Sequence, residues 1–334
     1  MSRITIREVA RHAGVSYQTV SRVINNSPEV AEDTRAQVQR TIEQLDYHPN
    51  AQAVSLSRNR SNIIGMIVDR AGDAFWGPIV DGASKALTER NRFMLLTETD
   101  HLEQPSAIAA LLRSRRIDGM ILALPLADSL EQIHELAKDR LPLVIIDLQF
   151  PIDVDHIAID NHRGAYLGTE HLIQLGHRRI GLICGPSMLP VSQSRHEGYR
   201  AALAEYGVPY DPQLIIPGEF LLRSGAEGTK KLLALADPPT AIFAGDDLMA
   251  IGAMQVLAQR GLRVPADISI VGFDDIEYAQ YTHPPLTTVR QPLREMGYLA
   301  GLHLCQVIDG DTEPLRTTLV PDLVVRASTA CITL

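Results

Sequence analysis

Four polar side chains near the N-terminus have the types and the spacing that can read the edges of DNA bases. Tyr17, Gln18, Ser21 and Arg22 occupy positions i, i+1, i+4 and i+5, so on a helix they share one face. Arginine can donate two hydrogen bonds to guanine O6 and N7, and glutamine can pair with adenine N6 and N7. The apolar residues of the same segment fall on the opposite face. The pattern predicts a base-reading helix, although a solvated face on a small helical cap would show the same spacing.

A second set of polar and aromatic side chains follows apolar segments in the rest of the chain. Its members are Asp69, Arg70, Phe75, Trp76, Asp160, Arg195, Phe220, Asp246, Asp274 and Asp275. Carboxylates accept hydrogen bonds, arginine presents a fork of donors and aromatic rings cover apolar faces, so these groups could hold a small polar ligand. We expect Arg195 in an early turn of one helix and Phe220 at the start of another.

Structural roles are open to the same residues. Asp160 and Asp247 suit helix capping, and Asp274 and Asp275 could do the same. An arginine can form an internal ion pair, and neighbouring aromatic rings can belong to a core. The residues alone leave both readings open.

Three short helices are predicted to position the first set. Residues 5–8, Thr-Ile-Arg-Glu, form a capping-box pattern, and Gly14 ends the helix that begins there. Ser16 is a good N-cap for a second helix over about 17–25, and a third is expected over about 31–45. A helix, a tight glycine turn and a second short helix make a helix-turn-helix.

The charge distribution agrees with a DNA-binding N-terminus. The 334-residue chain has a formal net charge of −9, yet residues 1–60 hold eight arginines, no lysine and six acidic residues. This segment is therefore about +2 and the remainder about −11. A small positive head on an acidic body suits nucleic-acid binding by the head.

The segment 6–23, IREVARHAGVSYQTVSRV, resembles the DNA-binding head of the LacI/GalR family, which commonly reads hydrophobic-x-x-V-A-x-x-A-G-V-S-x-x-T-V-S-R-V. Further matches are Thr34-Arg35, Leu45, Tyr47, Pro49-Asn50 and Ala53. The resemblance implies a head over 1–49 and DNA contacts from a defined set of residues. They are Thr5, Ser16, Tyr17, Gln18, Ser21, Arg22, Asn25, Asn50, Ala53 and Leu56.

A short linker follows the head. Pro49 breaks the third helix, and Asn50 could cap a helix of seven residues, too short to be stable alone in water. The residues therefore indicate a flexible linker in the isolated protein. The resemblance implies a hinge over 50–61 that becomes helical on DNA and inserts Leu56 into the minor groove.

Apolar segments of strand length alternate with helical segments through residues 61–334. Strands are expected at 63–68, 93–97, 119–124, 143–146, 180–184, 241–244 and 268–271, and helices at 79–88, 131–138, 165–175 and 249–260. The alternation predicts parallel sheets covered by helices, and the length favours two lobes over one sheet. Ligands in such folds lie at the carboxyl ends of strands.

This body resembles a periplasmic-binding-protein-like effector domain, in stretches such as 175–180, 246–252 and 269–275. The resemblance implies a domain over 62–334, with a DNA-proximal lobe of 62–160 and 291–319 and a distal lobe of 161–290 and 320–334. It also implies effector contacts. They are Asp69, Phe75, Trp76, Asp160, Arg195, Phe220, Asp246, Asp274 and Asp275.

The body departs from the family pattern in two places. Residues 72–74, Gly-Asp-Ala, replace the frequent Asn-Pro before the aromatic pair, and Asp246 stands where asparagine is frequent. Both changes touch predicted ligand contacts, so the ligand of a relative cannot simply be transferred to this chain.

Together these observations predict a repressor that binds double-stranded, pseudo-palindromic operator DNA as a homodimer under the control of a small effector. A neutral sugar is favoured, because its hydroxyls suit the aspartates and Arg195, and its apolar face suits the aromatic rings. A phosphorylated ligand would be repelled by the carboxylates. A nucleobase, which could also stack between rings, is the alternative.

Other classes of protein fit the sequence less well. GxGxxG, GxxxxGK[ST], HExxH and GxSxG are absent, so no cofactor, no metal and no catalytic residue is predicted. The carboxylates resemble a glycosidase pair, but they lie on the matched effector positions. A transport receptor would have a similar body yet leave residues 1–60 unexplained.

The compartment and the oligomer are predicted from simple absences. There is no signal-peptide pattern at the N-terminus, no apolar run of membrane-spanning length and no CxxC among three cysteines, so a cytoplasmic protein is expected. No leucine heptad follows the body, which favours a dimer over a tetramer.

Overall fold

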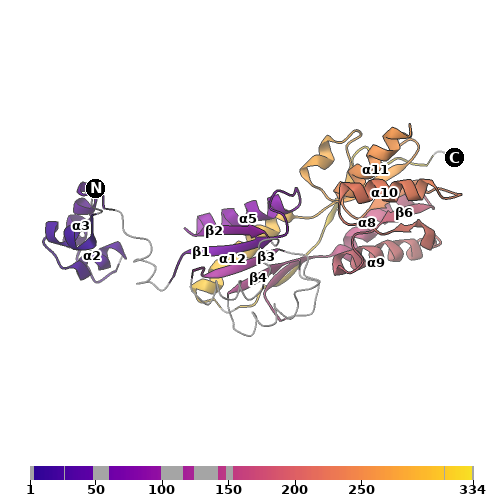
Figure 1. The fold of residues 1–334 in the computed structure, drawn as a ribbon. Coiled ribbons are helices and arrows are strands. Elements are labelled where there is room, and N and C mark those ends of the chain that lie inside the picture. The colour runs from indigo at the N-terminus through magenta and orange to yellow at the C-terminus, as the bar shows by residue number, and fades with distance from the viewer. Residues whose placement is uncertain are drawn as a thin grey trace. The chain divides into compact units, whose positions relative to one another are not determined.

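The computed structural model describes residues 4–25, 27–47, 60–98, 116–123, 142–147, 153–311 and 313–332. The chain divides into two compact units, Met1–Ser61 and Asn62–Leu334, each considered by itself (Figure 1). Three of the predicted DNA contacts, Asn50, Ala53 and Leu56, lie outside the described residues, as does the predicted helix at 131–138. In the described part of the chain, no helix has both the length and the apolar character needed to cross a membrane.

The head consists of α1 (Ile6–His12), α2 (Tyr17–Ile24) and α3 (Glu32–Gln44) in its described part. The predicted helix-turn-helix is confirmed in its local detail. Thr5 and Glu8 form the capping box, and Gly14 adopts a φ of +64° between α1 and α2. Oγ of Ser16 accepts a hydrogen bond from the backbone N–H of Thr19 at 3.1 Å, which caps α2. Local capping and turn chemistry therefore sets the angle between the two helices.

A small apolar core holds the head together. Val9, Val20 and Val38, one from each helix, are fully buried, and Ile42 and Leu45 pack against them partly buried. The side-chain amide of Gln37 donates to the carbonyl oxygen of Ala13 at 3.0 Å and ties α3 to the turn. This packing compensates for the low stability that such short helices would have alone.

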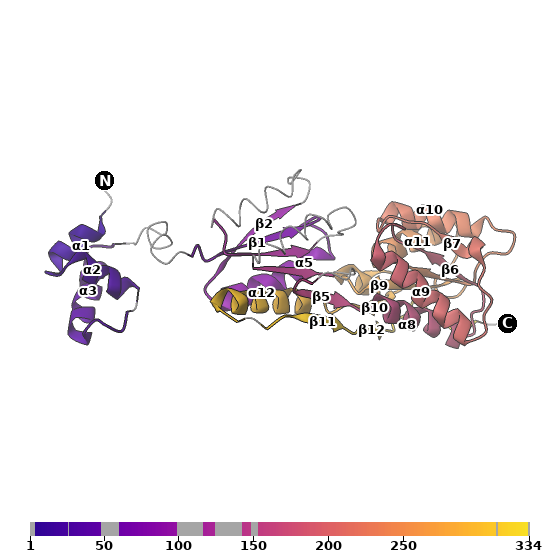
Figure 2. The same ribbon diagram turned by 90° about the horizontal axis from the view of Figure 1, so that it is seen from below.

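The body contains two mainly parallel sheets (Figure 2), and each has six strands in its described part. The first has the order β11-β5-β4-β3-β1-β2 and the second the order β12-β10-β9-β8-β6-β7. The first-sheet strands are β1 (Ile63–Val68), β2 (Phe93–Glu98), β3 (Gly119–Ala123), β4 (Leu143–Ile146), β5 (His156–Ile159) and β11 (Arg316–Leu319). The second-sheet strands are β6 (Ile180–Ile183), β7 (Ile215–Ile216), β8 (Ala241–Ala244), β9 (Ser269–Asp274), β10 (Thr287–Arg290) and β12 (Asp322–Val324). Only the pairing of β10 with β12 is antiparallel among the described strands.

Helices cover both sheets. They are α5 (Trp76–Glu89), α8 (Asn161–Gln174), α9 (Pro190–Glu205), α10 (Leu222–Leu233), α11 (Asp247–Gln259) and α12 (Leu293–Asp309), with 3-10 helices η2 (Pro212–Leu214) and η3 (Glu277–Tyr281). α5 and α12 pack together in the first lobe, α8 with α9 and α10 with α11 in the second. The predicted fold class, a helix-turn-helix head with a two-lobed α/β body, is confirmed.

The chain passes from one sheet to the other three times within the described residues. The crossings follow β5, β10 and β11. At the first crossing the backbone N–H of Asp160 donates to the carbonyl oxygen of Leu319 at 3.0 Å, so the first and third crossing segments are hydrogen-bonded to each other.

Five strands were not predicted from the sequence, namely β5, β7, β10, β11 and β12. The reason is visible in β10, which begins with two buried threonines instead of apolar residues. Thr287 and Thr288 are fully buried because their hydroxyls have partners, Thr288 donating to Asp247 at 2.5 Å and Thr287 lying 3.3 Å from the hydroxyl of Thr329. Buried hydroxyls that are hydrogen-bonded do not carry an apolar signature.

Glycines allow α5 and α12 to approach closely. A Cβ on Gly82 would overlap the carbonyl oxygen of Arg294, and one on Gly297 would overlap that of Ile79. The two backbones are therefore in direct contact, and no side chain larger than hydrogen fits at either position.

We expect Gly82→Ala to lower the free energy of unfolding by roughly 1–3 kcal/mol, because the helices must separate to admit the methyl group. Gly77→Ala in the same helix is the matched control, since no heavy atom lies within 4 Å of its added Cβ. That control should be neutral or gain up to about 1 kcal/mol from helix propensity. Urea denaturation of both variants measures the difference, and equal midpoints would contradict the close-contact argument.

Candidate functional site

The outer face of α2 carries the predicted base-reading side chains. Tyr17 is 53% exposed, Gln18 and Arg22 are exposed, and Ser21 is half-buried. Val20 and Val23 on the other face are buried in the head core, as the periodicity predicts. The helix therefore presents hydrogen-bonding groups to solvent from a backbone fixed by its apolar face.

The remaining described members of the predicted DNA set occupy helix ends. Thr5 caps α1, and its hydroxyl donates to Glu8 at 2.9 Å. Ser16 caps α2, while Asn25 ends it. The capping hydroxyls are exposed, so they are accessible while they stabilise the helices.

Arg195, in the second turn of α9, is a buried centre of polar contacts in the second lobe. It is only 5% exposed, and its Nε donates to Oδ1 of Asn161 at 2.8 Å. Its Nη1 donates to the carbonyl oxygen of Gly245, and its Nη2 lies 3.6 Å from Oδ1 of Asp274. The guanidinium carbon lies 3.7 Å from the centre of the Phe273 ring. The internal ion pair considered as an alternative role for Arg195 is thus present.

The two aspartates at the end of β9 have different partners. Asp274 is 6% exposed, and its Oδ1 accepts from Nε2 of Gln291 at 2.6 Å. Asp275 accepts from Nε of Arg290 at 2.7 Å and from Nη2 of Arg326 at 2.6 Å. Neither aspartate caps a helix, because η3 begins after Ile276 with no side-chain cap. Asp275 is therefore an ion-pair centre, whereas Asp274 belongs to the Arg195 cluster.

The capping role at the end of β8 belongs to Asp246, not to Asp247 as predicted. Oδ1 of Asp246 accepts from the backbone N–H of Met249 at 2.7 Å and caps α11. Asp247 is the first residue of that helix and is fully buried, where it accepts from Thr288 and from the backbone N–H of Ile276 at 2.9 Å. The pair of adjacent aspartates allowed either assignment from sequence, and only the helix start decides between them.

At the first crossing segment Asp160 is a cap, as its alternative reading predicted. Its Oδ1 accepts from the backbone N–H of Arg163 at 2.8 Å at the start of α8. The neighbouring Asn161 is buried and holds Arg195, a contact that was not predicted. No local signal marked Asn161, because β5 was not predicted and the role of an amide shows only once its partner is known.

The predicted effector contacts of the first lobe lie on the segment that follows β1. Asp69 is partly exposed and lies 3.6 Å from Nε of Arg70, which also approaches Asp73 at 3.8 Å. Phe75 is the N-cap of α5 and Trp76 is its first residue, and their ring centroids lie 4.7 Å apart in an edge-to-face arrangement. Both rings pack half-buried against the core of the first lobe, so they have one covered and one accessible side.

Phe220 precedes α10 by two residues and does not start it, which corrects the prediction. It adopts a left-handed φ of +56°, and its ring lies against Gly185 at the end of β6. The guanidinium of Arg195 lies 5.5 Å from the centre of this ring. The ring is thereby placed beside the Arg195 cluster.

Carboxylates from both lobes act on each other electrostatically. The pKa of Asp246 is raised to about 6, chiefly by burial. The hydrogen bond from Met249 and the charge of Arg195 oppose this rise, and the charge of Asp73 from the first lobe contributes to it. Burial also raises the pKa of Asp274 well above its usual range, with Arg195 lowering it and Asp246 and Asp147 raising it. The carboxyl ends of β1 and β4 in one lobe and of β8 and β9 in the other therefore share one polar region, which we call the inter-lobe site.

Two buried polar atoms near this site have no hydrogen-bond partner among the described residues. They are Oγ of Ser192, beside Phe220 and Gly185, and Oε1 of Gln291. Orphaned buried acceptors and donors are uncommon and indicate places where a ligand or water can bind. The sequence did not predict four residues of this region, namely Ser192, Gln291, Asp73 and Asp147. No group of three or more candidate metal ligands occurs in the part of the chain that the structure describes.

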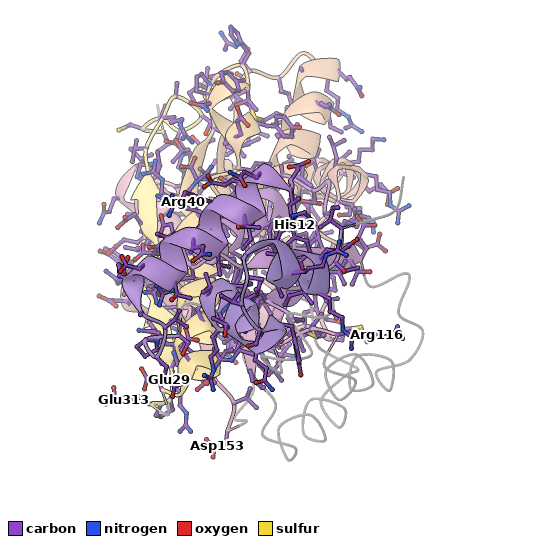
Figure 3. The ribbon with its side chains drawn as sticks, turned by 90° about the vertical axis from the view of Figure 1, so that its left-hand side faces the viewer. His12, Glu29, Arg40, Arg116, Asp153 and Glu313 are labelled. Atoms are coloured by element: carbon purple, nitrogen blue, oxygen red, sulfur yellow. The ribbon has the colours of Figure 1, made fainter. Side chains whose placement is uncertain are left out.

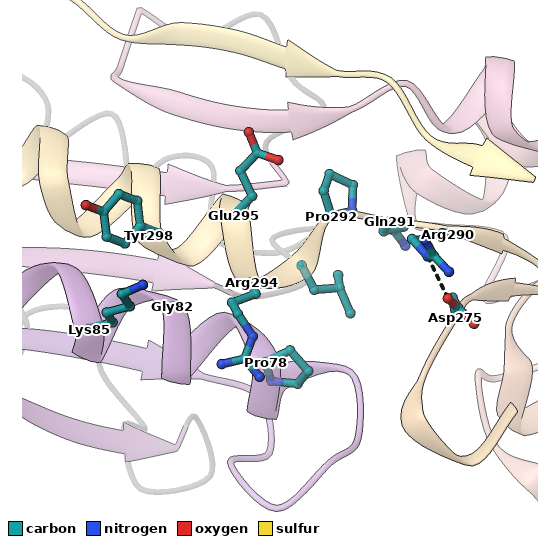
Figure 4. Close-up of a pocket in the computed structure, with 11 residues that line it drawn as sticks. Pro78, Gly82, Lys85, Asp275, Arg290, Gln291, Pro292, Arg294, Glu295 and Tyr298 are labelled. Atoms are coloured by element: carbon teal, nitrogen blue, oxygen red, sulfur yellow. Dashed lines mark hydrogen bonds and ion pairs between the residues drawn. The ribbon is translucent and has the colours of Figure 1, made fainter. Parts of the chain in front are cut away.

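A groove of about 550 Å³ adjoins the second crossing segment (Figure 4). It is lined by Pro78, Gly82, Lys85, Asp275, Arg290, Gln291, Pro292, Leu293, Arg294, Glu295 and Tyr298. Most of its charged groups are paired, Arg290 with Asp275 and Arg294 with Asp81. One pair lies within the second lobe and the other within the first lobe, on either side of the crossing segment.

A helix-turn-helix head with an exposed polar face, joined to a two-lobed α/β body with an inter-lobe polar site, defines a ligand-responsive DNA-binding regulator. Residues 5–50 match the model of the bacterial regulatory proteins of the lacI family, and residues 169–329 match that of the periplasmic binding protein-like domain. The chain belongs to the LacI family, and it is a ligand-responsive transcriptional repressor. The resemblance noted in the sequence is thus confirmed.

Relatives share nearly the full length of the chain. The HTH-type transcriptional regulator DegA of Bacillus subtilis is 36% identical over 333 residues, 98% of each chain. The ribose operon repressor of Haemophilus influenzae is 37% identical over 329 residues, 97% of this chain and 98% of its own. These proteins are regulators rather than enzymes, and the same holds for this chain.

Solved structures agree with the fold. The lac repressor dimer bound to operator and the anti-inducer ONPF has a TM-score of 0.87 at 31% identity, covering 98% of this chain and 100% of its own. The complex of the transcriptional regulator CelR with cellobiose has a TM-score of 0.74 at 36% identity, with the same coverage.

Asp246 gives a pH-dependent prediction. Its raised pKa means that the folded state holds the proton more tightly than the unfolded chain between the ordinary value of 3.8 and about 6. The stability contributed by this carboxyl therefore falls as pH rises through that window. Asp246→Asn keeps an acceptor for Met249 and removes the titration, so its stability relative to wild type should increase from about pH 4 to about pH 7, by roughly 1–3 kcal/mol.

Asp211 provides a control of opposite sign. Its pKa is lowered by the hydrogen bond from the backbone N–H of Gln213 and by Arg179, and it is partly buried. Asp211→Asn should therefore lose stability relative to wild type as pH rises from acid values. Urea denaturation across this pH range measures both, and a stability difference for Asp246→Asn that does not change with pH would contradict the assignment.

Proposed function

We propose that the protein represses transcription by binding a pseudo-palindromic operator as a homodimer, and that a neutral sugar in the inter-lobe site controls this binding. The observation that carries the effector assignment is the Arg195 cluster, where a fork of donors, two aspartates and an aromatic ring meet. The proposed division is a head over 1–49, a hinge over 50–61 and an effector domain over 62–334. Within that domain, 62–160 with 291–319 would be the DNA-proximal lobe.

The base-reading assignment rests on the exposed face of α2. Tyr17, Gln18 and Arg22 supply the donors and acceptors, while Ser16, Ser21 and Asn25 lie at its ends and flank. A homodimer presents two such helices, which matches the two-fold symmetry of a pseudo-palindrome. The related lac repressor binds its operator as a dimer, which supports the same arrangement here.

A surface in the second lobe suits the dimer. Tyr278 and Tyr281 on η3 are 57% and 69% exposed. Ala279 of the same short helix is fully buried in the second-lobe core, so the two rings project from a fixed element. Exposed aromatic side chains are enriched at interfaces between proteins.

The sugar assignment rests on the chemistry of the inter-lobe site. Vicinal hydroxyls both donate and accept, so Asp246 and Asp274 can accept from a sugar while Arg195 donates to it. Phe75 or Trp76 would cover one apolar face, and Phe220 the other. A cellobiose complex of one structural relative and a ribose operon repressor among the sequence relatives support this class of ligand.

Three other predicted contacts take supporting positions. Asp160 and Asp275 already accept hydrogen bonds from backbone or arginine, and Asp69 lies at the exposed end of β1. We assign them to the margin of the site, where they orient the residues that touch the ligand. A phosphorylated sugar is disfavoured because several carboxylates surround a single buried cation.

A nucleobase is the second candidate. The edge-to-face pair of Phe75 and Trp76 offers a ring surface on which a purine could stack. Such a ligand would use Asp246 and Asp274 as acceptors for its ring N–H groups.

Coupling between the sites is proposed to run through the hinge. Effector binding would change how the two hinges of a dimer meet, with 50–58 helical on the operator and Leu56 in the minor groove. Effector and operator must then alter each other's affinity by the same factor. We place the protein in the cytoplasm, associated with the nucleoid when bound to operator.

Replacing Arg22 should weaken the preference for operator over random DNA more than it weakens DNA binding in general. We expect Arg22→Ala to weaken operator binding by roughly 1–3 kcal/mol relative to random DNA, the value of one bidentate base contact. Mobility-shift titration of the full-length protein at fixed salt measures both affinities. If operator and random duplex were bound with the wild-type ratio, the base-reading role of Arg22 would be wrong.

The sugar assignment predicts a specific calorimetric result. Neutral mono- and disaccharides should release heat on binding to wild type, whereas purines should not. Arg195→Lys should lose most of this affinity, since a lysine keeps the charge without the fork of donors. Arg200→Lys, on the exposed side of the same helix, should bind as wild type does.

The outcomes separate the two candidate ligands. Micromolar binding of a purine with no heat from any sugar would replace the sugar by the nucleobase. Wild-type affinity in Arg195→Lys would show that the ligand binds elsewhere.

A further inference from the structure

An acidic residue outside the predicted DNA contacts lies beside the base-reading helix. Oε2 of Glu29 lies 3.7 Å from Nη2 of Arg22, and the two side chains are 68% and 58% exposed. Glu29 is on the loop between α2 and α3 and is labelled in Figure 3. One exposed ion pair contributes little to stability, so its location is more informative than its energy.

The loop that carries Glu29 is tied to α3. Nη2 of Arg35 donates to the carbonyl oxygen of Ser27 at 2.6 Å, and Nε of Arg35 lies 3.9 Å from Glu32. The backbone N–H of Glu29 donates to Oγ of Ser27 at 3.4 Å. Arg35 is itself half-buried, so these contacts hold the loop against the helix core. The fold of the head therefore positions the backbone of Glu29, and its exposed carboxylate lies beside Arg22.

We propose that Glu29 is a specificity-determining residue that reads the base pair next to the guanine bound by Arg22. The inference rests on the proposed base-reading role of α2. It is carried by the observation that Glu29, which can only accept hydrogen bonds, lies beside Arg22, which can only donate them, on one exposed face.

The chemistry of the major groove gives this pair a defined preference. Cytosine N4 and adenine N6 present donors there, whereas guanine O6 and thymine O4 present acceptors. A carboxylate only accepts, so Glu29 can bind cytosine or adenine and repels guanine and thymine. The 3.7 Å between Glu29 and Arg22 is close to the rise of about 3.4 Å between successive base pairs. A carboxylate this close to Arg22 is within reach of the base pair next to the guanine that Arg22 would bind.

Simple repulsion between Glu29 and the DNA backbone would change the measured affinities in a different way. A carboxylate that merely repels the phosphate backbone would weaken binding to every sequence by the same factor. A carboxylate that reads a base changes the ratio between sequences. The two are distinguished by comparing affinities across sequences, not by one affinity.

The experiment uses the full-length protein. A duplex library randomised over the binding site is selected with wild type, which yields its preferred sequence, and four duplexes are then made that differ only at the pair next to the Arg22-dependent guanine. Wild type, Glu29→Gln and Glu32→Gln are titrated against all four at one salt concentration. Glu32 is the matched control, an exposed acid three residues along that pairs with Arg35 instead of Arg22.

We expect wild type and Glu32→Gln to prefer the two duplexes that place the donor base, cytosine or adenine, on the strand that Glu29 faces, by about tenfold or more. Glu29→Gln should bind all four within about threefold, because an amide both donates and accepts. Equal strengthening of all four by Glu29→Gln, or an unchanged preference, would overturn the inference while leaving the repressor assignment intact. Failure of wild type to select any shared sequence would instead defeat the proposed function, and this inference with it.

Discussion

The guanidinium of Arg195 is the interaction on which the rest of the inter-lobe site depends. Desolvating a charge is expensive unless it is paired and hydrogen-bonded, and here all three nitrogens approach partners. Those partners come from three different elements, namely Asn161 at the start of α8, Gly245 after β8 and Asp274 at the end of β9. Removing the arginine would leave buried carboxylates without their cation. The hydrogen bonds and the ion pair of Arg195 therefore fix both the guanidinium and the chain segments that follow the strands.

Several non-glycine residues around this charge have a backbone with positive φ. Asp274, Asp275 and Phe220 adopt φ values of +110°, +57° and +56°, and Asp147 in the other lobe adopts +62°. Residues with side chains seldom occupy these conformations, which cost on the order of 1–3 kcal/mol each when strained. Such positions persist where surrounding contacts over-determine them, as the arginine pairs of Asp275 do. Their gathering at the inter-lobe site is independent support for a functional role.

Much of the fold follows from the sequence because its signals are local. The capping box at Thr5, the turn at Gly14 and the apolar strands β1, β4 and β8 each depend on a few adjacent residues. β10 escaped prediction because its buried threonines are satisfied by partners that are distant in sequence. The choice between Asp246 and Asp247 as cap depended on where α11 begins.

The candidate site was only partly predictable for the same reason. Arg195, Asp246 and Asp274 could be named from position after strands or within a helix, and the structure brings these three together. Asn161 and Gln291 could not, since an amide gives no signal until its partner is known. Asp275 stays a predicted ligand contact, and the structure adds that both of its oxygens accept from arginines.

These missed amides connect the ligand chemistry to the motion that a two-lobed receptor needs. Asn161 directly follows the first crossing segment and accepts from Arg195, while Gln291 lies in the second crossing segment and donates to Asp274. The first segment is in turn hydrogen-bonded to the third through Asp160 and Leu319. A ligand that competes for Arg195 or Asp274 must therefore change hydrogen bonds made by the segments about which the lobes would rotate. A ligand shifts a conformational equilibrium only by its differential interaction with the two states. In this protein the groups proposed to bind the ligand are bonded directly to the crossing segments, so that difference can arise without any longer chain of contacts.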